Sequence, residues 1–224
     1  MTLKSEIEAE FGLPLLNGCG ITECAPGISS VRASAPSSDN AVGPLIAGIE
    51  ARLVKPGGGG AVAPGEVGEL QVRSPNVMRG YYRAPEVTAA AIDRDGWFNT
   101  GDLGRFDGDI LFIVGRTKEL IIRSGFNVYP AEVEAVLNEH PAVVQSAVIG
   151  RAVTANEEVV AFVQLVPGST VKPTDMMAHA ARQLAPYKRP CEIIMLDALP
   201  AGSTGKILKH RLAGVARDQA TRQA

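Results

Sequence analysis

The stretch G-R-T-K-E-L-I-I-R-S-G-F-N-V-Y-P-A-E-V-E, residues 115–134, marks a change in the pattern of the sequence. Its apolar segment 120–123 is typical of a strand, and a helix is predicted over 130–140, where Pro141 ends it. Beyond it, apolar runs that predict strands alternate with helical patterns: strands 143–150, 157–166 and 192–197, helices 173–185 and 206–218. We therefore expect an α+β lobe over residues 116–224, with a short sheet flanked by helices.

Residues 1–115, before this stretch, are expected to be rich in β-structure. Helices are predicted over 1–11 and 84–93, a short buried strand at 13–17 and a loop over 29–40. Strands are predicted at 49–54 and 68–74, then a turn at 95–102 and two strands joined at Asp107-Gly108. The four glycines 57–60 are interpreted as a hairpin tip, because a phosphate loop requires a helix directly after it and a strand follows here. The fold class is thus α/β, of the α+β kind, with a domain boundary after residue 115.

Composition excludes several classes of function. The 22 Lys and Arg nearly balance the 24 Asp and Glu, so no nucleic acid partner is indicated. No apolar run approaches the roughly 20 residues of a membrane span, and the charged N-terminus is unlike a signal peptide. Three cysteines and three histidines show no disulfide or zinc spacing. We expect reduced thiols and a cytoplasmic location.

Four segments, taken together and in this order, resemble the adenylate-forming (AMP-binding) superfamily of acyl-CoA synthetases, adenylation domains and luciferases. They are NGCGITE (17–23), GELQVRSPNVMRGYY (68–82) continuing to GWFNTGDLG (96–104), the stretch 115–134, and LPAGSTGKILKHRL (199–212). The resemblance implies an AMP-forming carboxylate–CoA ligase. Such an enzyme joins a carboxylate to the α-phosphate of ATP, releases pyrophosphate, and then passes the acyl group to the thiol of coenzyme A.

The resemblance assigns nucleotide-binding roles to the first part of the chain. Thr22 is expected to offer its hydroxyl to the adenylate phosphate, and Glu23 to hold Mg²⁺, which favours carboxylate oxygen. Gly20 and Ile21 of the same segment are expected to line the nucleotide site. Asp102 would accept hydrogen bonds from the ribose hydroxyls, and Arg116 would also contact the ribose. Without this context, Thr22 and Glu23 would be read as helix-capping residues and Asp102 as a turn residue.

It also assigns roles after the boundary. Lys118 falls at the hinge position, with a solvated linker residue as the alternative. Ser124, Gly125 and Phe126 resemble the loop along the pantetheine arm of coenzyme A. Gly125 is explained equally by a turn and by close approach of that arm. Lys206 resembles the catalytic lysine that bridges the substrate carboxylate and the α-phosphate.

Two of the departures from the family pattern bear on the nucleotide site. Cys19 stands where an aromatic residue is usual, which puts the shape of the nucleotide pocket in question. The Ser/Thr/Gly-rich loop that grips the β- and γ-phosphates has no counterpart in residues 1–16. We therefore expect the C-terminal portion of a ligase, inactive alone, that self-associates or requires a complementing N-terminal segment.

Two alternatives stay open: a non-catalytic remnant that binds nucleotide, coenzyme A or a partner, and a peptide-synthetase adenylation domain. The resemblance implies ATP or AMP, Mg²⁺, coenzyme A and a small carboxylic acid as ligands, and a place in fatty acid metabolism. The identity of the acid is not predicted.

Overall fold

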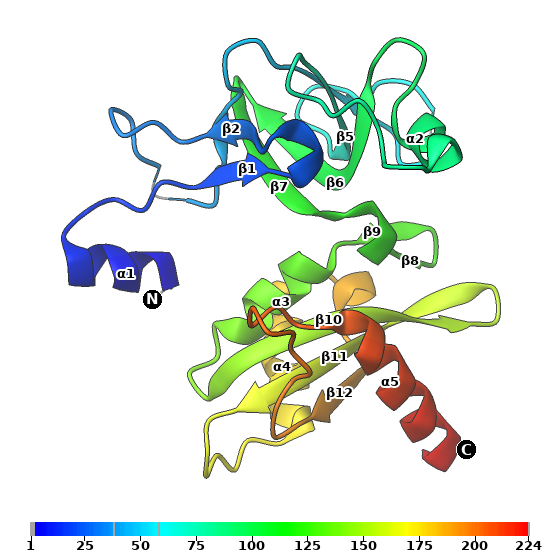
Figure 1. The fold of residues 1–224 in the computed structure, drawn as a ribbon. Helices are drawn as coiled ribbons and strands as arrows, with labels where there is room; N and C mark the ends of the chain where they lie inside the picture. Colours follow the sequence, from blue (N-terminus) through cyan, green and yellow to red (C-terminus); the bar gives the residue numbers. More distant parts are fainter. Residues whose placement is uncertain (1–2, 38, 58, 224) are drawn as a thin grey trace. The chain divides into compact units, whose positions relative to one another are not determined.

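The computed structural model describes residues 3–37, 39–57 and 59–223. It divides into two compact units, residues 1–118 and 119–224, each of mixed α/β structure (Figure 1). The expected fold class is confirmed. No helix in the described ranges has the length and apolar character to cross a bilayer.

A five-stranded antiparallel sheet forms the centre of the first unit, in the order β3-β7-β6-β5-β4. Its strands are β3 (Gly43–Pro44), β4 (Glu50–Val54), β5 (Gly68–Arg73), β6 (Phe98–Asp107) and β7 (Ile110–Arg116). The predicted Asp107-Gly108 turn joins β6 to β7, and Gly108 has the positive φ that such a turn requires. The buried core of this unit comprises Cys24, Ile28, Leu70, Val72, Phe98 and Leu111.

The remaining elements of this unit are helices and a small hairpin. They are α1 (Leu3–Phe11), β1 (Gly18–Gly20), η1 (Thr22–Cys24), β2 (Gly27–Ser30) and α2 (Pro85–Ala91). Strands β1 and β2 pair antiparallel. A short 3₁₀ turn, η2 (Thr117–Glu119), follows β7 and spans the division between the units.

Three predictions for the first unit are wrong. Residues 13–17 form no strand, and Leu13, Leu15 and Leu16 are exposed. An apolar pattern predicts burial, but it does not identify the surface that would cover these side chains. The predicted turn 95–102 contains the first residues of β6, and the predicted loop 29–40 begins inside β2.

The second unit places a three-stranded sheet between helices. The elements are β8 (Ile121–Arg123), β9 (Phe126–Val128), α3 (Pro130–Asn138), β10 (Val143–Val153), β11 (Asn156–Leu165), α4 (Pro173–Gln183), η3 (Pro186–Lys188), β12 (Glu192–Met195) and α5 (Lys209–Gln223). The sheet has the order β10-β11-β12, with β11 antiparallel to β10 and parallel to β12. Strands β8 and β9 form a separate hairpin.

Both faces of that sheet are covered. Alternate residues of β11 point to opposite faces. Val159, Ala161 and Val163 join a cluster with residues of α3 and α4, whereas Val160 and Phe162 join a cluster with residues of α5. Figure 1 shows α5 (red) apart from α3 and α4 around the sheet. The continuous apolar run of β11 is thus explained by burial on two sides.

Candidate functional site

The residues Gly20 to Glu23 lie on the connection of the β1–β2 hairpin. The N–H of Ile21 donates to the carbonyl of Pro26 at 2.8 Å, which closes the loop and presents the η1 turn. A Cβ at Gly20 would lie 2.5 Å from the Pro26 carbonyl oxygen, so this close backbone approach requires glycine. Ile21 packs against the core, whereas Thr22 is exposed. The hairpin therefore fixes the backbone and leaves the Thr22 hydroxyl at the surface.

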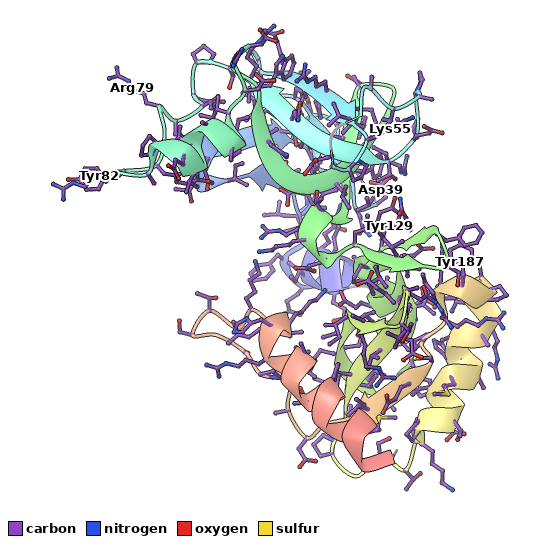
Figure 2. The ribbon with its side chains drawn as sticks, turned by 90° about the vertical axis from the view of Figure 1, so that its right-hand side faces the viewer. Asp39, Lys55, Arg79, Tyr82, Tyr129 and Tyr187 are labelled. Carbon is purple, nitrogen blue, oxygen red and sulfur yellow. The ribbon has the colours of Figure 1, made fainter. Side chains whose placement is uncertain are left out.

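Glu23 is oriented by Tyr81, a residue for which the sequence predicted no role. The hydroxyl of Tyr81 donates to Oε1 of Glu23 at 2.9 Å, and the N–H of Met78 donates to the Glu23 carbonyl at 2.7 Å. Burial, together with the bond to Glu23, raises the pKa of Tyr81, so the phenol stays a donor at neutral pH. Its neighbours Arg79 and Tyr82 point outward (Figure 2). The segment G-Y-Y (80–82) was the available sequence signal for Tyr81.

Asp102 and Arg116 form an ion pair across two adjacent strands. They are direct partners in the β6–β7 ladder, and Nε of Arg116 lies 3.2 Å from Oδ1 of Asp102. The Asp102 N–H donates to the hydroxyl of Thr100 at 3.1 Å. The Asp102 side chain is 9% exposed and that of Arg116 is 42% exposed. The carboxylate is therefore largely buried, and the guanidinium reaches solvent. The pair can present a carboxylate and a cation to one ligand.

Cys19 connects this ion pair to the β1–β2 hairpin. Burial raises the pKa of the Cys19 thiol to about 11, with a smaller contribution from the charge of Asp102, while Arg116 lowers it. The charges of Asp102 and Arg116, which come from two other motifs, therefore act on the Cys19 thiol. The thiol itself stays neutral at physiological pH.

Lys118 is exposed in the η2 turn, two residues after Arg116. The preceding Thr117 donates from its hydroxyl to Oε1 of Glu69 at 2.9 Å, which attaches this turn to β5. The peptide bond after Lys118 is where the chain passes from one compact unit to the other.

Ser124, Gly125 and Phe126 lie on the exposed tip of the β8–β9 hairpin. Ser124 and Gly125 both have positive φ, 52° and 81°, so the turn itself demands the conformation that Gly125 provides. The Ser124 N–H donates to Oδ1 of Asn156 at 2.7 Å, which fixes the turn to the start of β11. Phe126 stacks on Tyr187, with ring centroids 4.7 Å apart. Tyr187 is labelled in Figure 2. Phe126 is exposed and Tyr187 is half-buried. An aromatic pair of this kind beside a backbone turn suits a ligand that is flexible and partly apolar.

Lys206 is exposed on a separate loop of the second unit, ahead of α5. The N–H of Gly202 donates to the Lys206 carbonyl at 2.9 Å, and that of Gly205 donates to the Gly202 carbonyl at 3.0 Å. Gly205 has a φ of 79°. The backbone is thus a closed turn, and the Lys206 side chain is exposed on it.

No cluster of three or more His, Cys, Asp and Glu side chains suited to a metal ion occurs in the described parts of the chain. A magnesium ion needs no such cluster, because it keeps several waters and commonly binds one or two carboxylates plus substrate phosphates. Glu23, beside the exposed Thr22, fits that requirement.

Two family models match the chain. The model for the AMP-binding enzyme matches residues 1–82, and the model for the AMP-binding enzyme C-terminal domain matches residues 132–206. Among curated relatives, a 4-coumarate–CoA ligase-like protein of Arabidopsis thaliana is 37% identical over 88% of this chain and 36% of its own length. A feruloyl-CoA synthase of an Amycolatopsis species is 42% identical over 88% of this chain and 40% of its own.

Solved structures agree with these relatives. ATP-bound MatB from Rhodopseudomonas palustris has a TM-score of 0.90 and 36% identity over 96% of this chain and 43% of its own. The o-succinylbenzoate coenzyme A synthetase of Bacillus subtilis, in complex with ATP and a magnesium ion, has a TM-score of 0.81 and 32% identity over 92% of this chain and 43% of its own. The chain therefore spans about two fifths of the length of the proteins it resembles.

Proposed function

The chain belongs to the family of AMP-binding enzymes, and from that membership we propose that it supplies the C-terminal part of an AMP-forming carboxylate–CoA ligase. In the first step a carboxylate oxygen attacks the α-phosphorus of ATP, and pyrophosphate leaves. In the second the thiolate of coenzyme A attacks the acyl carbon, and AMP leaves. The overall products are acyl-CoA, AMP and pyrophosphate. The relatives named above, which are acyl- and aryl-CoA ligases, support this reaction class.

One observation carries the proposal most strongly: Asp102 and Arg116 come from two separate motifs and pair across β6 and β7, and the charges of both act on the Cys19 thiol of the β1–β2 hairpin. A buried carboxylate has two oxygens for the two hydroxyls of a ribose, and the neighbouring guanidinium donates from a planar fork. Thr22 and Glu23 belong to the same hairpin and follow Cys19 closely in sequence. The phosphates of a nucleotide bound at Asp102 would need hydrogen-bond donors and a metal ligand, which these two residues can provide.

Further residues would balance the negative charge that the phosphates and the substrate carboxylate carry during the reaction. Glu23, oriented by Tyr81, would hold Mg²⁺, which supplies positive charge to the phosphates when bound. Thr22 would donate to the α-phosphate. Lys206 would neutralise the carboxylate and the phosphate as they approach, and losing one such contact typically costs on the order of 10²–10³ in rate. In the second step, Ser124, Gly125 and Phe126 would line the path of the pantetheine arm, with Lys118 as the pivot between steps.

The acid is proposed only by class. Curated relatives of this chain include 4-coumarate–CoA ligases, a sulfoacetate–CoA ligase and a feruloyl-CoA synthase, so aryl and short anionic acids are the first candidates. A role in fatty acid metabolism and a cytoplasmic location stay predictions.

The test is a hybrid enzyme. The whole 224-residue chain would follow the portion of the R. palustris protein that precedes the matched region, and the R. palustris protein itself would be the control. We expect acyl-CoA and AMP to form in equal amounts, each requiring ATP, acid, coenzyme A and Mg²⁺. A folded hybrid that binds ATP yet forms no AMP with any acid that the control accepts would contradict the proposal. That outcome favours a non-catalytic binding remnant.

A further inference from the structure

Three charged side chains from separate segments of the second unit meet beside the loop of Lys206. Lys209, the first residue of α5, places its Nζ 2.8 Å from Oε2 of Glu119 and 2.8 Å from Oε1 of Glu134. Glu119 ends the η2 turn directly after Lys118, and Glu134 lies on α3. This cluster, Lys209 with Glu119 and Glu134, has no part in the chemistry described above.

The cluster is partly buried, and its charge is fixed. The three side chains are 23%, 33% and 18% exposed. Burial lowers the pKa of Lys209, but the charge of Glu134 and the hydrogen bonds to both carboxylates outweigh it, so the pKa lies above the ordinary lysine value. The ammonium thus stays protonated between the carboxylates. Removing it would leave two negative groups facing each other with little water, which is strongly unfavourable.

One carboxylate is itself held by the sheet. Oε1 of Glu134 accepts a hydrogen bond from the N–H of Val148 at 2.7 Å, and Val148 is a buried residue of β10. Helix α3 packs Val133 and Leu137 into the same core as Val148. Glu134 is therefore a rigid anchor, and Lys209 is attached through it to the centre of the unit.

The loop of Lys206 is closed at its base, next to Lys209. The N–H of Leu208 donates to the Pro200 carbonyl at 2.7 Å, and Ala201 pairs with Ile207 in a short antiparallel bridge. Every residue between this base and the tip belongs to the hairpin-like turn that carries Lys206. The direction of the whole turn is consequently set where it joins α5. The first residue of α5 is Lys209, whose side chain Glu119 and Glu134 hold.

We propose that Lys209 is a positioning residue: the pair Glu119 and Glu134 clamps it, and through the base of the loop it fixes the direction in which Lys206 is presented. The inference rests on the proposed role of Lys206. Since Glu119 is the residue after Lys118, the clamp also ties the start of the second unit to this loop. Lys209 does not touch the reacting groups; it acts through Lys206.

The test compares Lys209→Met, which keeps the aliphatic stem, with Lys209→Arg, which restores the cation. The matched control is Arg151→Met: Arg151 is a similarly buried cation of the same unit, bound to Glu158 and Glu192 on the sheet. Two measurements are made: hydrogen exchange of the Gly202 and Leu208 amides in the 224-residue chain, and kcat and KM for ATP in pyrophosphate exchange by the hybrid enzyme.

For Lys209→Met we expect both amides to exchange at least about tenfold faster, and kcat to fall roughly tenfold with KM for ATP nearly unchanged, since small misplacements of a catalytic group are costly. Lys209→Arg should recover most of both losses. Arg151→Met should lower the melting temperature. It should change neither the exchange rates of the two amides nor kcat.

Unchanged amide exchange in Lys209→Met would overturn the inference, as would an equal loss of kcat in Arg151→Met. If Lys209→Met fails to fold, Glu119→Gln takes its place, because it weakens the clamp and keeps the lysine. We then expect the same effects on amide exchange and kcat, but smaller ones. The amide measurement requires no catalysis. If Lys206→Ala kept normal pyrophosphate exchange, the proposed function would fail. That outcome is distinguishable from a failure of the clamp, which the amide exchange reports.

Discussion

The two units differ in how they hold the side chains that we assign to function. In the first unit these side chains have partners: Glu23 bonds to Tyr81, and Asp102 pairs with Arg116 on the sheet. In the second unit, Lys206 and the turn at Ser124 to Phe126 are exposed, and Phe126 has one partner, the ring of Tyr187. Substitution in the first unit should therefore affect folding as well as activity, whereas substitution of the exposed residues in the second should affect activity with little effect on folding.

The units also differ in their cores. The second covers both faces of its three-stranded sheet, but most of the exposed large apolar side chains belong to the first, including Phe11, Leu13 and Leu16. A surface of this kind is typical of one that another polypeptide covers. The second unit is thus the more self-sufficient of the two.

The largest expected effect is that of Lys206→Ala. In the hybrid enzyme, acid-dependent exchange of labelled pyrophosphate into ATP should fall on the order of 10²–10³-fold, because charge neutralisation at the reacting phosphate is lost. The melting temperature should be unchanged, since the side chain is exposed. If the melting temperature of Lys206→Ala fell together with its activity, the expected contrast between the two units would be wrong.

Asp102→Asn should affect both properties. It removes a buried charge from its pair with Arg116 and one proposed acceptor for the ribose, so the affinity for ATP should fall roughly tenfold to a hundredfold. Titration calorimetry of the hybrid measures the affinity, and thermal unfolding should show a melting temperature lower by several degrees. Unaltered ATP affinity would show that Asp102 serves the fold alone.

Apolar exposure in the first unit predicts self-association of the 224-residue chain. The double substitution Phe11→Ser with Leu13→Ser should weaken association by at least about tenfold, because burying one such side chain contributes about 1.5–3 kcal/mol. Sedimentation velocity over a concentration series measures it. Val144→Ser, which removes an exposed apolar residue of the second unit, is the control and should change little. A wild-type chain that stays monomeric at high concentration contradicts the prediction.

The smallest expected effect is on stability in Phe126→Ala. Phe126 is exposed where it stacks on Tyr187, so the free energy of unfolding should fall by only about 0.5 kcal/mol. Chemical denaturation of the chain provides the measurement. A loss of several kcal/mol would mean that Phe126 is a core residue, and the proposed contact with coenzyme A would lose its support.

The elements with clear periodicity were predictable from sequence. The apolar run 157–166 became β11, and Asp107-Gly108 became the β6–β7 turn, because each pattern reflects a local requirement. The pattern at 13–17 misled because those residues are apolar yet exposed in the structure. Strands β1 and β9, three residues each, are too short to show a period.

The candidate site was predictable only where motifs name its residues. Thr22, Glu23, Asp102 and Lys206 follow from the resemblance, and their roles stay predictions. The partner of Glu23 did not follow, because Tyr81 lies 58 residues away. Likewise, Lys209 and Glu119 are 90 residues apart, and only the folded chain brings the lysine to that carboxylate. Long-range polar contacts of this kind leave no local signal.

We propose that the second unit carries two separate functional surfaces, Lys206 for adenylate formation and the turn at Phe126 for thioester formation. The most direct test measures both half-reactions in Lys206→Ala and Phe126→Ala hybrids: pyrophosphate exchange, and conversion of a chemically prepared acyl-adenylate to acyl-CoA. We predict that Lys206→Ala loses only the first and Phe126→Ala mainly the second. Loss of the same half-reaction in both variants would contradict the account.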